Sequence, residues 1–490
     1  MKNDHSFDFH RLDRRDFLKA GIGTLGGLGV ILMLPAVVRG AEDSAIKGRK
    51  PNIIFILTDD QGYGDLSCHG NPLLKTPNID KLYSESVRFT DFQVSPLCSP
   101  TRCALMTGRH EYRSGVHNTR GPGQNMDIKA TTIAQVLKSA GYSTGIFGKW
   151  HLGAEPEYQP WKRGFDVALS FSTGMIGEGS PSGMNLFDGN LWRNGKSEKT
   201  KGFCTDVFFE EAKKWIADIK GKGPFFAYIP TNAPHTPLDC PEEFIKPYQG
   251  KAPTENMAKY FGMIANIDAN VGKLMAQLKE WKIDNDTLVI FMTDNGASNH
   301  FKDKPSPVAF YNAGMKGSKG SVEEGGTRVP SFWRLPGEFK GGVDVDRLTS
   351  NIDVFPTLAE MAGAKIPADL KLDGRSLVPL LKNPKSDWTD RFVFIHESNW
   401  GGNPADHKAT GFAVRNDRFR LVGNKELFDV KADRGQTKNV YDANTQVANK
   451  MKEAYDKWWE EVLPPLQENA KGDEADEKQD KSKKKNKKEK

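Results

Sequence analysis

The sequence predicts an α/β protein with a large, mostly parallel sheet flanked by helices and a small antiparallel sheet near its C-terminus. Continuous apolar runs, as expected of strands buried on both faces, alternate with segments of helical spacing. Two of these runs end in acidic pairs, which suits strand ends that meet at one edge of a parallel sheet. From about Arg391, short strands bounded by Asn, Asp and Gly replace this alternation.

The alternating region begins at residue 51 and continues to residue 363. Strands are expected at residues 51–58, 142–147, 225–229 and 287–293, and helices at 131–140, 205–219, 255–281 and 353–363. Gly141 ends the first of these helices, as a glycine just past a helix commonly does. Residues 172–202 are rich in glycine and weakly patterned, so they are expected to form a long surface loop.

The C-terminal part is expected to form a separate small subdomain. Short strands are predicted at residues 392–396, 411–414, 419–422 and 427–430, followed by a helix at 443–459. We therefore expect a catalytic α/β domain at residues 50–385 and an α+β subdomain at 386–466. Residues 467–490 are charged and polar, and we expect a disordered tail there.

The N-terminus carries the marks of an export signal. Arg14-Arg15-Asp16-Phe17-Leu18-Lys19 precedes a glycine-rich apolar run over residues 20–38, a pattern that resembles a bacterial twin-arginine signal. The alternative is a transmembrane anchor, but the apolar run is short and interrupted by glycines. We therefore expect residues 1–41 to be a cleaved signal, and the protein to be exported to the periplasm or beyond by the twin-arginine machinery.

Composition fits a soluble globular protein of one large or two unequal domains. Of the 490 residues, 37% are hydrophobic and 27% charged, and the net charge of +6 lies largely at the two ends. Acids and bases are interspersed between those ends, so nucleic acid is excluded as the main partner. Five cysteines, at positions 68, 98, 103, 204 and 240, are too few and too scattered for a disulfide scaffold.

Two acidic pairs point to a metal site. Asp59-Asp60 and Asp294-Asn295 each follow a predicted buried strand, so they are candidates to converge. Four oxygen donors without His suit Ca²⁺, with Mg²⁺ as the second choice, rather than zinc. The alternative for each pair alone is helix capping or turn formation, the commonest use of Asp and Asn after a strand.

The stretch Cys98-Ser99-Pro100-Thr101-Arg102, continued by Leu105-Met106-Thr107-Gly108-Arg109, is the most specific motif of the chain. It places a thiol at a bend stiffened by proline, close to a fixed cation and to the start of a helix, which favours an anion. It resembles the signature of the type I sulfatases. In that family the cysteine is oxidised by a maturation enzyme to a formylglycine aldehyde, and the resemblance implies this change at Cys98.

Three further blocks match the same family in order. They are Gly148-Lys149-Trp150-His151-Leu152-Gly153, Asn232-Ala233-Pro234-His235-Thr236-Pro237, and Gly317-Ser318-Lys319-Gly320 with Glu324-Gly325-Gly326-Thr327-Arg328-Val329-Pro330. Each lone His or Lys has an alternative as an ordinary packed or solvated residue. The resemblance runs from about Pro51 to Asn439 and weakens over residues 427–434.

The resemblance implies an alkaline-phosphatase-like fold and a set of residue roles. Residue 98 and the two acidic pairs would hold the cation, while Arg102 would keep residue 98 in place. Lys149, His235 and Lys319 would bind substrate, His235 or Lys319 would protonate the leaving alcohol, and His151 would act as the base. A hydroxyl of the hydrated aldehyde would attack sulfur.

The expected function is hydrolysis of sulfate esters, with sulfated carbohydrates as the substrate class. Trp192 and Arg193, together with His300 and Lys302, are candidates for sugar contacts on loops. The alternatives are a phosphodiesterase or phosphonate-ester hydrolase of the same superfamily, and a non-catalytic relative that binds anions or glycans. The complete set of motif residues disfavours the non-catalytic alternative.

Overall fold

The computed structural model of the chain describes residues 50–179, 181–298 and 311–488. The predicted export signal over residues 1–41 therefore lies outside the described residues, as do His300 and Lys302. None of the helices within the described ranges is both long and apolar enough to cross a membrane.

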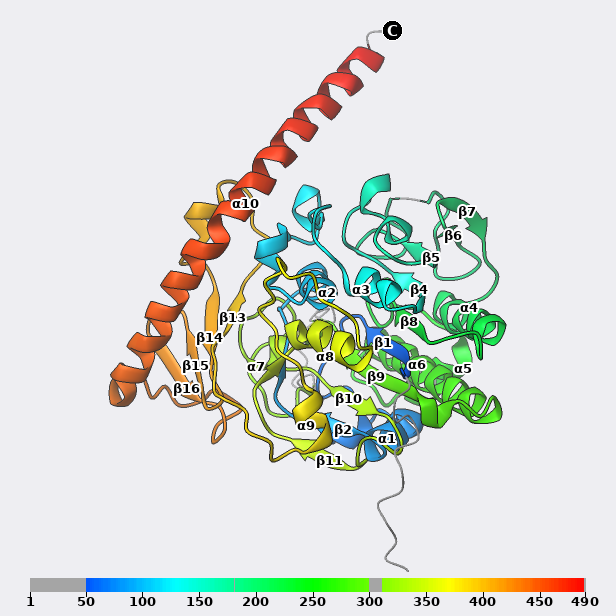
Figure 1. Cartoon of the computed structure of the whole chain (residues 1–490), viewed down its shortest axis with the longest axis horizontal. Coiled ribbons are helices and arrows are strands. Elements are labelled where there is room, and N and C mark those ends of the chain that lie inside the picture. Colours follow the sequence, from blue (N-terminus) through cyan, green and yellow to red (C-terminus); the bar gives the residue numbers. More distant parts are fainter. Residues whose placement is uncertain (1–49, 180, 299–310, 489–490) are drawn as a thin grey trace, which may run out of the picture. The chain divides into compact units, whose positions relative to one another are not determined.

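A ten-stranded sheet forms the centre of the structure (Figure 1). In spatial order its strands are β11 (Val343–Val345), β2 (Val87–Phe89), β10 (Ser331–Arg334), β9 (Thr287–Thr293), β1 (Asn52–Thr58), β8 (Phe225–Pro230), β4 (Ser143–Lys149), β5 (Val167–Phe171), β6 (Asn190–Arg193) and β7 (Lys196–Lys199). The five central strands, from β9 to β5, are mutually parallel. The expectation of a mostly parallel sheet is confirmed, with antiparallel strands toward the edges.

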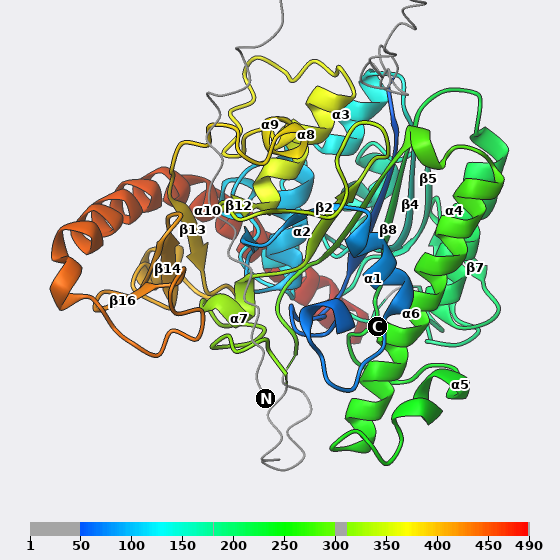
Figure 2. The same cartoon turned by 90° about the horizontal axis from the view of Figure 1, so that it is seen from below.

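Helices cover both faces of this sheet (Figure 2). One face carries α1 (Pro77–Ser84), α4 (Cys204–Ile219) and α6 (Glu255–Glu280); the other carries α2 (Cys98–Thr107), α3 (Ile133–Ser139) and α8 (Val354–Met361). Successive residues of β1 alternate between the two cores, with Phe55 in one and Ile56 in the other. A strand buried on both faces needs apolar residues at every position, which explains its continuous apolar run.

Four short strands form a separate antiparallel sheet, as expected. These are β13 (Val393–His396), β14 (Phe412–Arg415), β15 (Phe419–Val422) and β16 (Glu426–Asp429). The long helix α10 (Thr445–Lys488) packs across them through Met451, Tyr455 and Trp459. Its backbone stays helical as far as Lys488, within the segment expected to be a disordered tail, which is rich in the helix formers Lys and Glu.

The expectation that residues 172–202 form one long surface loop is wrong in part. Its second half forms the hairpin of β6 and β7, which extends the sheet at one edge. Asn194 and Gly195 make the turn with φ values of 47° and 86°, and this Asn-Gly pair was the overlooked hairpin signal. Arg193, a candidate sugar contact, forms ion pairs with Glu198 and Glu211.

Candidate active site

The ends of four neighbouring parallel strands bring the predicted site together. In the sheet, β9, β1, β8 and β4 lie side by side and run in the same direction. Thr58 is paired with Thr293, so the acidic pairs that follow them are neighbours. The Asp59 N–H donates to the Ala233 carbonyl at 3.1 Å, which draws in the segment that follows β8. Lys149 is the last residue of β4.

Asp60 and His151 both have a left-handed backbone, with φ of 65° and 59°. Such a conformation is costly for residues other than glycine and persists where surrounding contacts impose it. The Asp60 N–H donates to Asp294 Oδ1 at 3.1 Å, and the Tyr260 hydroxyl donates to the Asp60 carbonyl at 2.9 Å. These bonds aim the Asp60 carboxylate away from the direction that an extended strand would give it.

Cys98 is the first residue of α2 and is buried, with 2% of its surface exposed. Its sulfur and carboxylate oxygens of Asp59 and Asp294 lie within 4.8 Å of one another. Burial raises the pKa of the Cys98 thiol, although Lys149 and Lys319 oppose that rise. All five cysteines of the chain are unpaired in the structure, so none is held in a disulfide.

Three buried ion pairs neutralise the carboxylates of the site. Arg102 Nη2 lies 2.7 Å from Asp294 Oδ2, Lys149 Nζ lies 2.7 Å from Asp59 Oδ2, and Lys319 Nζ lies 2.6 Å from Asp60 Oδ1. The three carboxylate side chains are fully buried. Removing one member of such a pair would leave its buried partner without a compensating group, which is strongly destabilising.

The two adjacent carboxyl groups differ in acidity. Burial raises the pKa of Asp59 to about 8, supported by repulsion from Asp294 and opposed mainly by Lys149. Burial acts in the same direction on Asp60, but Lys319 and His235 outweigh it and hold the pKa of that carboxyl below its usual range. Different surroundings therefore give two neighbouring aspartates different pKa values.

The donor set fits a hard divalent cation. Oδ1 of Asp59 and Oδ1 of Asn295 are buried and have no hydrogen-bond partner among the described residues. Such orphaned oxygens are costly unless something else coordinates them. Asn295 Nδ2 donates a hydrogen bond to Asp60 Oδ1 at 2.9 Å, so the amide oxygen of Asn295 is the atom that can bind a cation. Oxygen atoms clustered in this way are typical ligands of Ca²⁺ and Mg²⁺.

The His151 ring is fixed in one tautomer by its hydrogen bond. Its Nε2 lies 2.9 Å from the Thr119 carbonyl oxygen, which can only accept, so Nε2 carries the hydrogen. Nδ1 is then an acceptor, and it is buried without a hydrogen-bond partner among the described residues. Burial, with Lys149 nearby, lowers the pKa of His151 well below its ordinary value, so the ring is neutral. Ser99 Oγ donates to the His151 carbonyl at 2.8 Å.

His235 lies on the opposite flank, with Nε2 3.6 Å from Asp60 Oδ2. Its Nδ1 lies 2.7 Å from the carbonyl oxygen of Thr236. Burial lowers the pKa of His235 to about 4, and Asp60 opposes that shift. For Lys319, burial acts to lower the pKa, but the contact with Asp60 outweighs it and holds the ammonium charged.

Each residue that the sequence singles out for catalysis or metal binding lies in this one cluster. The cluster comprises Asp59, Asp60, Cys98, Arg102, Lys149, His151, His235, Asp294, Asn295 and Lys319. Thr119 and Tyr260, which hold His151 and Asp60, were missed. Thr119 acts through its backbone carbonyl, so nothing in its residue type signals that contact.

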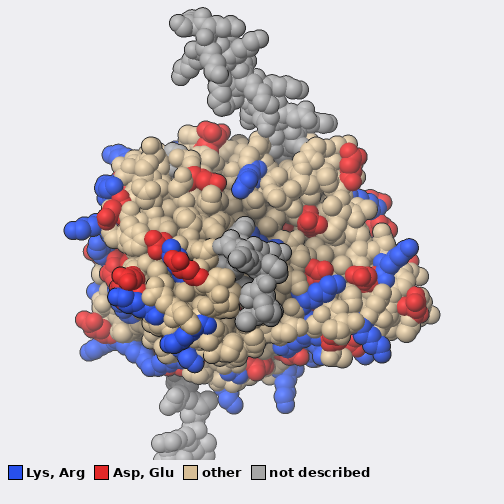
Figure 3. All heavy atoms as spheres, turned by 180° about the vertical axis from the view of Figure 1, so that it is seen from behind, with Lys and Arg blue, Asp and Glu red and all other residues tan. Residues whose placement is uncertain are grey.

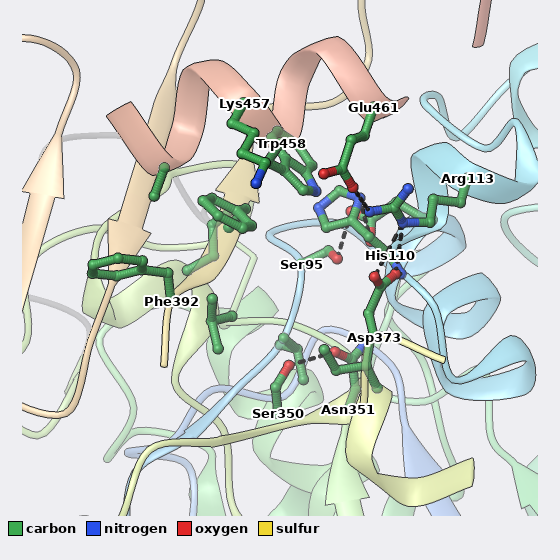
Figure 4. Close-up of a pocket in the computed structure, with 17 residues that line it drawn as sticks. Ser95, His110, Arg113, Ser350, Asn351, Asp373, Phe392, Lys457, Trp458 and Glu461 are labelled. Atoms are coloured by element: carbon green, nitrogen blue, oxygen red, sulfur yellow. Dashed lines mark hydrogen bonds and ion pairs between the residues drawn. The ribbon is translucent and has the colours of Figure 1, made fainter. Parts of the chain in front are cut away.

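A cavity of about 330 Å³ opens between the C-terminal helix α10 and the α/β domain (Figure 4). Arg113 in its wall is bonded to Asp373 and Glu461, and no residue of the cluster lines it. On the face seen in Figure 3, basic and acidic side chains are interspersed.

Comparison with known proteins identifies two matching family regions. The family described as Sulfatase matches residues 51–364, well over half of the chain. The family described as N-sulphoglucosamine sulphohydrolase, C-terminal, matches residues 318–461. The second region begins in the segment that carries Lys319 and covers the small antiparallel sheet.

Individual relatives and solved structures agree with those matches. Human arylsulfatase A is 34% identical over 417 residues, which cover 76% of this chain and 74% of the relative. Human N-acetylgalactosamine-6-sulfatase is 30% identical, covering 71% and 69%. The crystal structure of Ps i-CgsB in complex with k-i-k-neocarrahexaose superposes with a TM-score of 0.73 at 30% identity, covering 84% of this chain and 93% of that one.

Proposed function

We propose that this chain, which belongs to the sulfatase family and is a sulfuric ester hydrolase, acts on sulfated carbohydrates through a formylglycine made from Cys98 and a bound divalent cation. The observation that carries the proposal is the position of Cys98. It lies at the start of a helix, within 4.8 Å of the buried carboxylates of Asp59 and Asp294, and the charges of Lys149 and Lys319 act on it. A thiol used only for packing does not require that charged setting.

Two groups complete the site in this proposal. A cation held by Asp59, Asp60, Asp294, Asn295 and residue 98 would screen the negative charge of a sulfate ester and polarise its oxygens. An aldehyde at position 98, made by two-electron oxidation of the thiol and loss of its sulfur in a maturation enzyme, would supply hydroxyl groups as its hydrate. Covalent catalysis of this kind divides one difficult displacement into two easier steps.

The chain's own cations bind and orient the sulfate group. The charges of Lys149 and Lys319 both act on Cys98 and favour a negative charge there. Arg102 bonds Asp294 through two nitrogens and the Lys149 carbonyl through a third. It therefore fixes helix α2, and residue 98 with it, against the ends of β9 and β4. Fixed charges in a buried site stabilise the charge that develops as the ester bond breaks.

Proton transfer falls to the histidines and Lys319. The free Nδ1 of His151 is an acceptor, so it is suited to take a proton from residue 98 after that residue has been hydrated. Lys319 or His235, on the Asp60 side, would protonate the departing alcohol. Replacing the true donor by alanine should slow esters of poor leaving groups far more than esters of good ones, and comparing Lys319→Ala with His235→Ala identifies it.

The substrate class is proposed from the relatives. N-acetylgalactosamine-6-sulfatase acts, by its name, on a sulfated sugar, and Ps i-CgsB was crystallised with a neocarrahexaose. Export through the twin-arginine pathway fits such a substrate, because large sulfated saccharides lie outside the cell. A panel of sulfated saccharides, assayed for released sulfate, tests this class, and activity confined to small aryl sulfates would contradict it.

The mechanism is tested by Cys98→Ala. We expect this variant to fold as the parent does but to release no sulfate, whereas full activity would rule the mechanism out. The alternative, a phosphodiesterase or phosphonate-ester hydrolase, is tested by rates on sulfate and phosphate esters of one leaving group. A higher kcat/KM on the phosphate ester would favour that alternative.

A further inference from the structure

A cluster of fully buried charges joins the small C-terminal sheet to the active-site domain. Asp91 and Glu324 supply its carboxylates, and Arg328, Arg415 and Arg420 supply its guanidinium groups. The five side chains are at most 1% exposed. Arg415 lies on β14 and Arg420 on β15, while Glu324 begins the short helix α7 (Glu324–Thr327), which lies beside the small sheet (Figure 2).

Arg420 distributes its bonds over two different segments of the α/β domain. Its Nη2 donates to Gln93 Oε1 at 2.7 Å and to Thr327 Oγ1 at 2.9 Å. Its Nη1 donates to the Val322 carbonyl, and its Nε donates to Glu324 Oε1 at 2.9 Å. One guanidinium therefore contacts both segments with donors held in a fixed plane.

These two segments carry the two sides of the active site. Gln93 ends β3 (Phe92–Gln93), from which the chain runs directly to Cys98. Val322 lies just after Lys319. Their backbones also touch: the Val94 N–H donates to the Thr327 carbonyl at 2.8 Å, and the Gly320 N–H donates to the Pro96 carbonyl at 2.9 Å. The distance between residue 98 and Lys319 therefore depends on the hydrogen bonds that hold these two segments together.

The cluster fixes the relative positions of the segments that it joins more than it raises the stability of the fold. Three guanidinium groups face two carboxylates, and burial lowers the pKa of Arg420 to about 10. Buried ion networks of this kind are often no more stabilising than apolar side chains of the same volume. Their directional bonds, in contrast, specify one arrangement of the segments that they join.

We propose that Arg420, supplied by the C-terminal sheet, is a positioning residue that fixes Lys319 relative to residue 98. The inference rests on the proposed function only in that Lys319 takes part in the reaction. It makes the C-terminal sheet an integral part of the active site, since a residue of that sheet sets the distance between two groups that it does not itself touch.

Arg415 provides a matched control. It is equally buried, comes from the neighbouring strand of the same sheet and contacts both carboxylates, Asp91 at 2.6 Å and Glu324 at 3.0 Å. Its side-chain contacts do not include Gln93, Val322 or Thr327. Arg415→Lys therefore disturbs the two carboxylates of the cluster but leaves the bonds that Arg420 makes to Gln93, Val322 and Thr327 in place.

The test compares Arg420→Lys and Arg415→Lys in the parent and in a Lys319→Ala background. For each variant the melting temperature, the fraction of residue 98 converted to aldehyde, and kcat and KM on an aryl sulfate are measured. We expect both Arg variants to melt at similar, lowered temperatures. Arg420→Lys should lower kcat/KM about tenfold per converted site and raise KM at least about threefold, because small misplacements in an active site are costly. Arg415→Lys should change both kcat/KM and KM by less than about twofold.

The Lys319→Ala background separates positioning from general damage. If Arg420 acts through Lys319, Arg420→Lys should lower kcat/KM by less than about twofold there, because the two losses are not additive. Equal losses in both backgrounds, an unchanged KM, or equal effects of the two Arg variants would overturn the proposal. Failure of the parent to release sulfate would instead count against the proposed function.

Discussion

The Arg102–Asp294 pair allows the buried charge balance of the site to be tested quantitatively. Asp294→Asn keeps the volume of the side chain and an oxygen for the Asp60 N–H, but places an amide where two guanidinium nitrogens now bond at 2.7 and 3.0 Å. The Arg102 side chain is 1% exposed, so water cannot solvate its guanidinium group when the Asp294 carboxylate is removed. Breaking a buried pair typically costs about 3–5 kcal/mol of unfolding free energy. Asp59 Oδ1, 3.8 Å from Arg102 Nη2, offsets part of that loss, so we expect about 3 kcal/mol.

The assay is urea-induced unfolding followed by fluorescence, with EDTA present so that bound cations do not contribute to stability. The parent, Asp294→Asn, Arg102→Met and the double variant form a cycle. Removing both partners also removes the uncompensated charge, so the double variant should recover about 2 kcal/mol relative to Asp294→Asn. Both variants that lack the Asp294 carboxylate should nevertheless remain inactive.

Two results would refute this reasoning. A loss below about 1 kcal/mol for Asp294→Asn would mean that the charge is not buried as the structure has it. A double variant no more stable than Asp294→Asn would mean that the loss comes from something other than the unpaired guanidinium.

Three further predictions concern pH, cations and the base. Burial raises the pKa of Glu111, which accepts a bond from Ser95, from 4.5 to about 7; its stabilising contribution is complete below pH 4.5 and is lost as the pH rises through 7. At pH 8, Glu111→Gln should therefore be more stable than the parent by up to about 3 kcal/mol, since the shift is about 2.5 pKa units at about 1.36 kcal/mol each. At pH 4 the two proteins should be equally stable. Urea unfolding at both pH values measures this, and an equal difference at both would contradict it. Chelation should lower both the melting temperature and the activity, because Asp59 and its neighbouring carboxylates then repel one another, and added Ca²⁺ should restore both; an unchanged melting curve would argue against a bound cation. His151→Gln should leave the melting temperature nearly unchanged but lower kcat by at least about a hundredfold in a sulfate-release assay, and near-normal kcat would exclude His151 as the base.

The sequence was sufficient to predict the fold class and the convergence of the site. Continuous apolar strands can only be buried on both faces, and parallel strands must end at a common edge. Those two constraints place Asp59 and Asp294 together although they are far apart along the chain. The boundaries of β1, β4, β8 and β9 agree with the prediction within about two residues, whereas the fifth central strand, β5, was not predicted.

What the sequence did not reveal depends on contacts between distant segments. The Thr119 carbonyl sets the tautomer of His151, and Arg420 joins the segments that carry Cys98 and Lys319. Neither role leaves a local pattern, because any residue has a carbonyl and a lone arginine is usually solvated. The hairpin at Asn194, in contrast, had a local signal that the glycine-rich composition around it obscured.

The central claim is that Cys98 is converted to an aldehyde within a site that needs it, and mass spectrometry tests this most directly. Trypsin releases the peptide over residues 89–102, which contains this cysteine alone. In active protein from its own host we predict this peptide to be lighter, with sulfur and two hydrogens replaced by one oxygen, and to react with hydrazide reagents in proportion to activity. Fully active protein whose peptide retains an intact thiol would contradict the account.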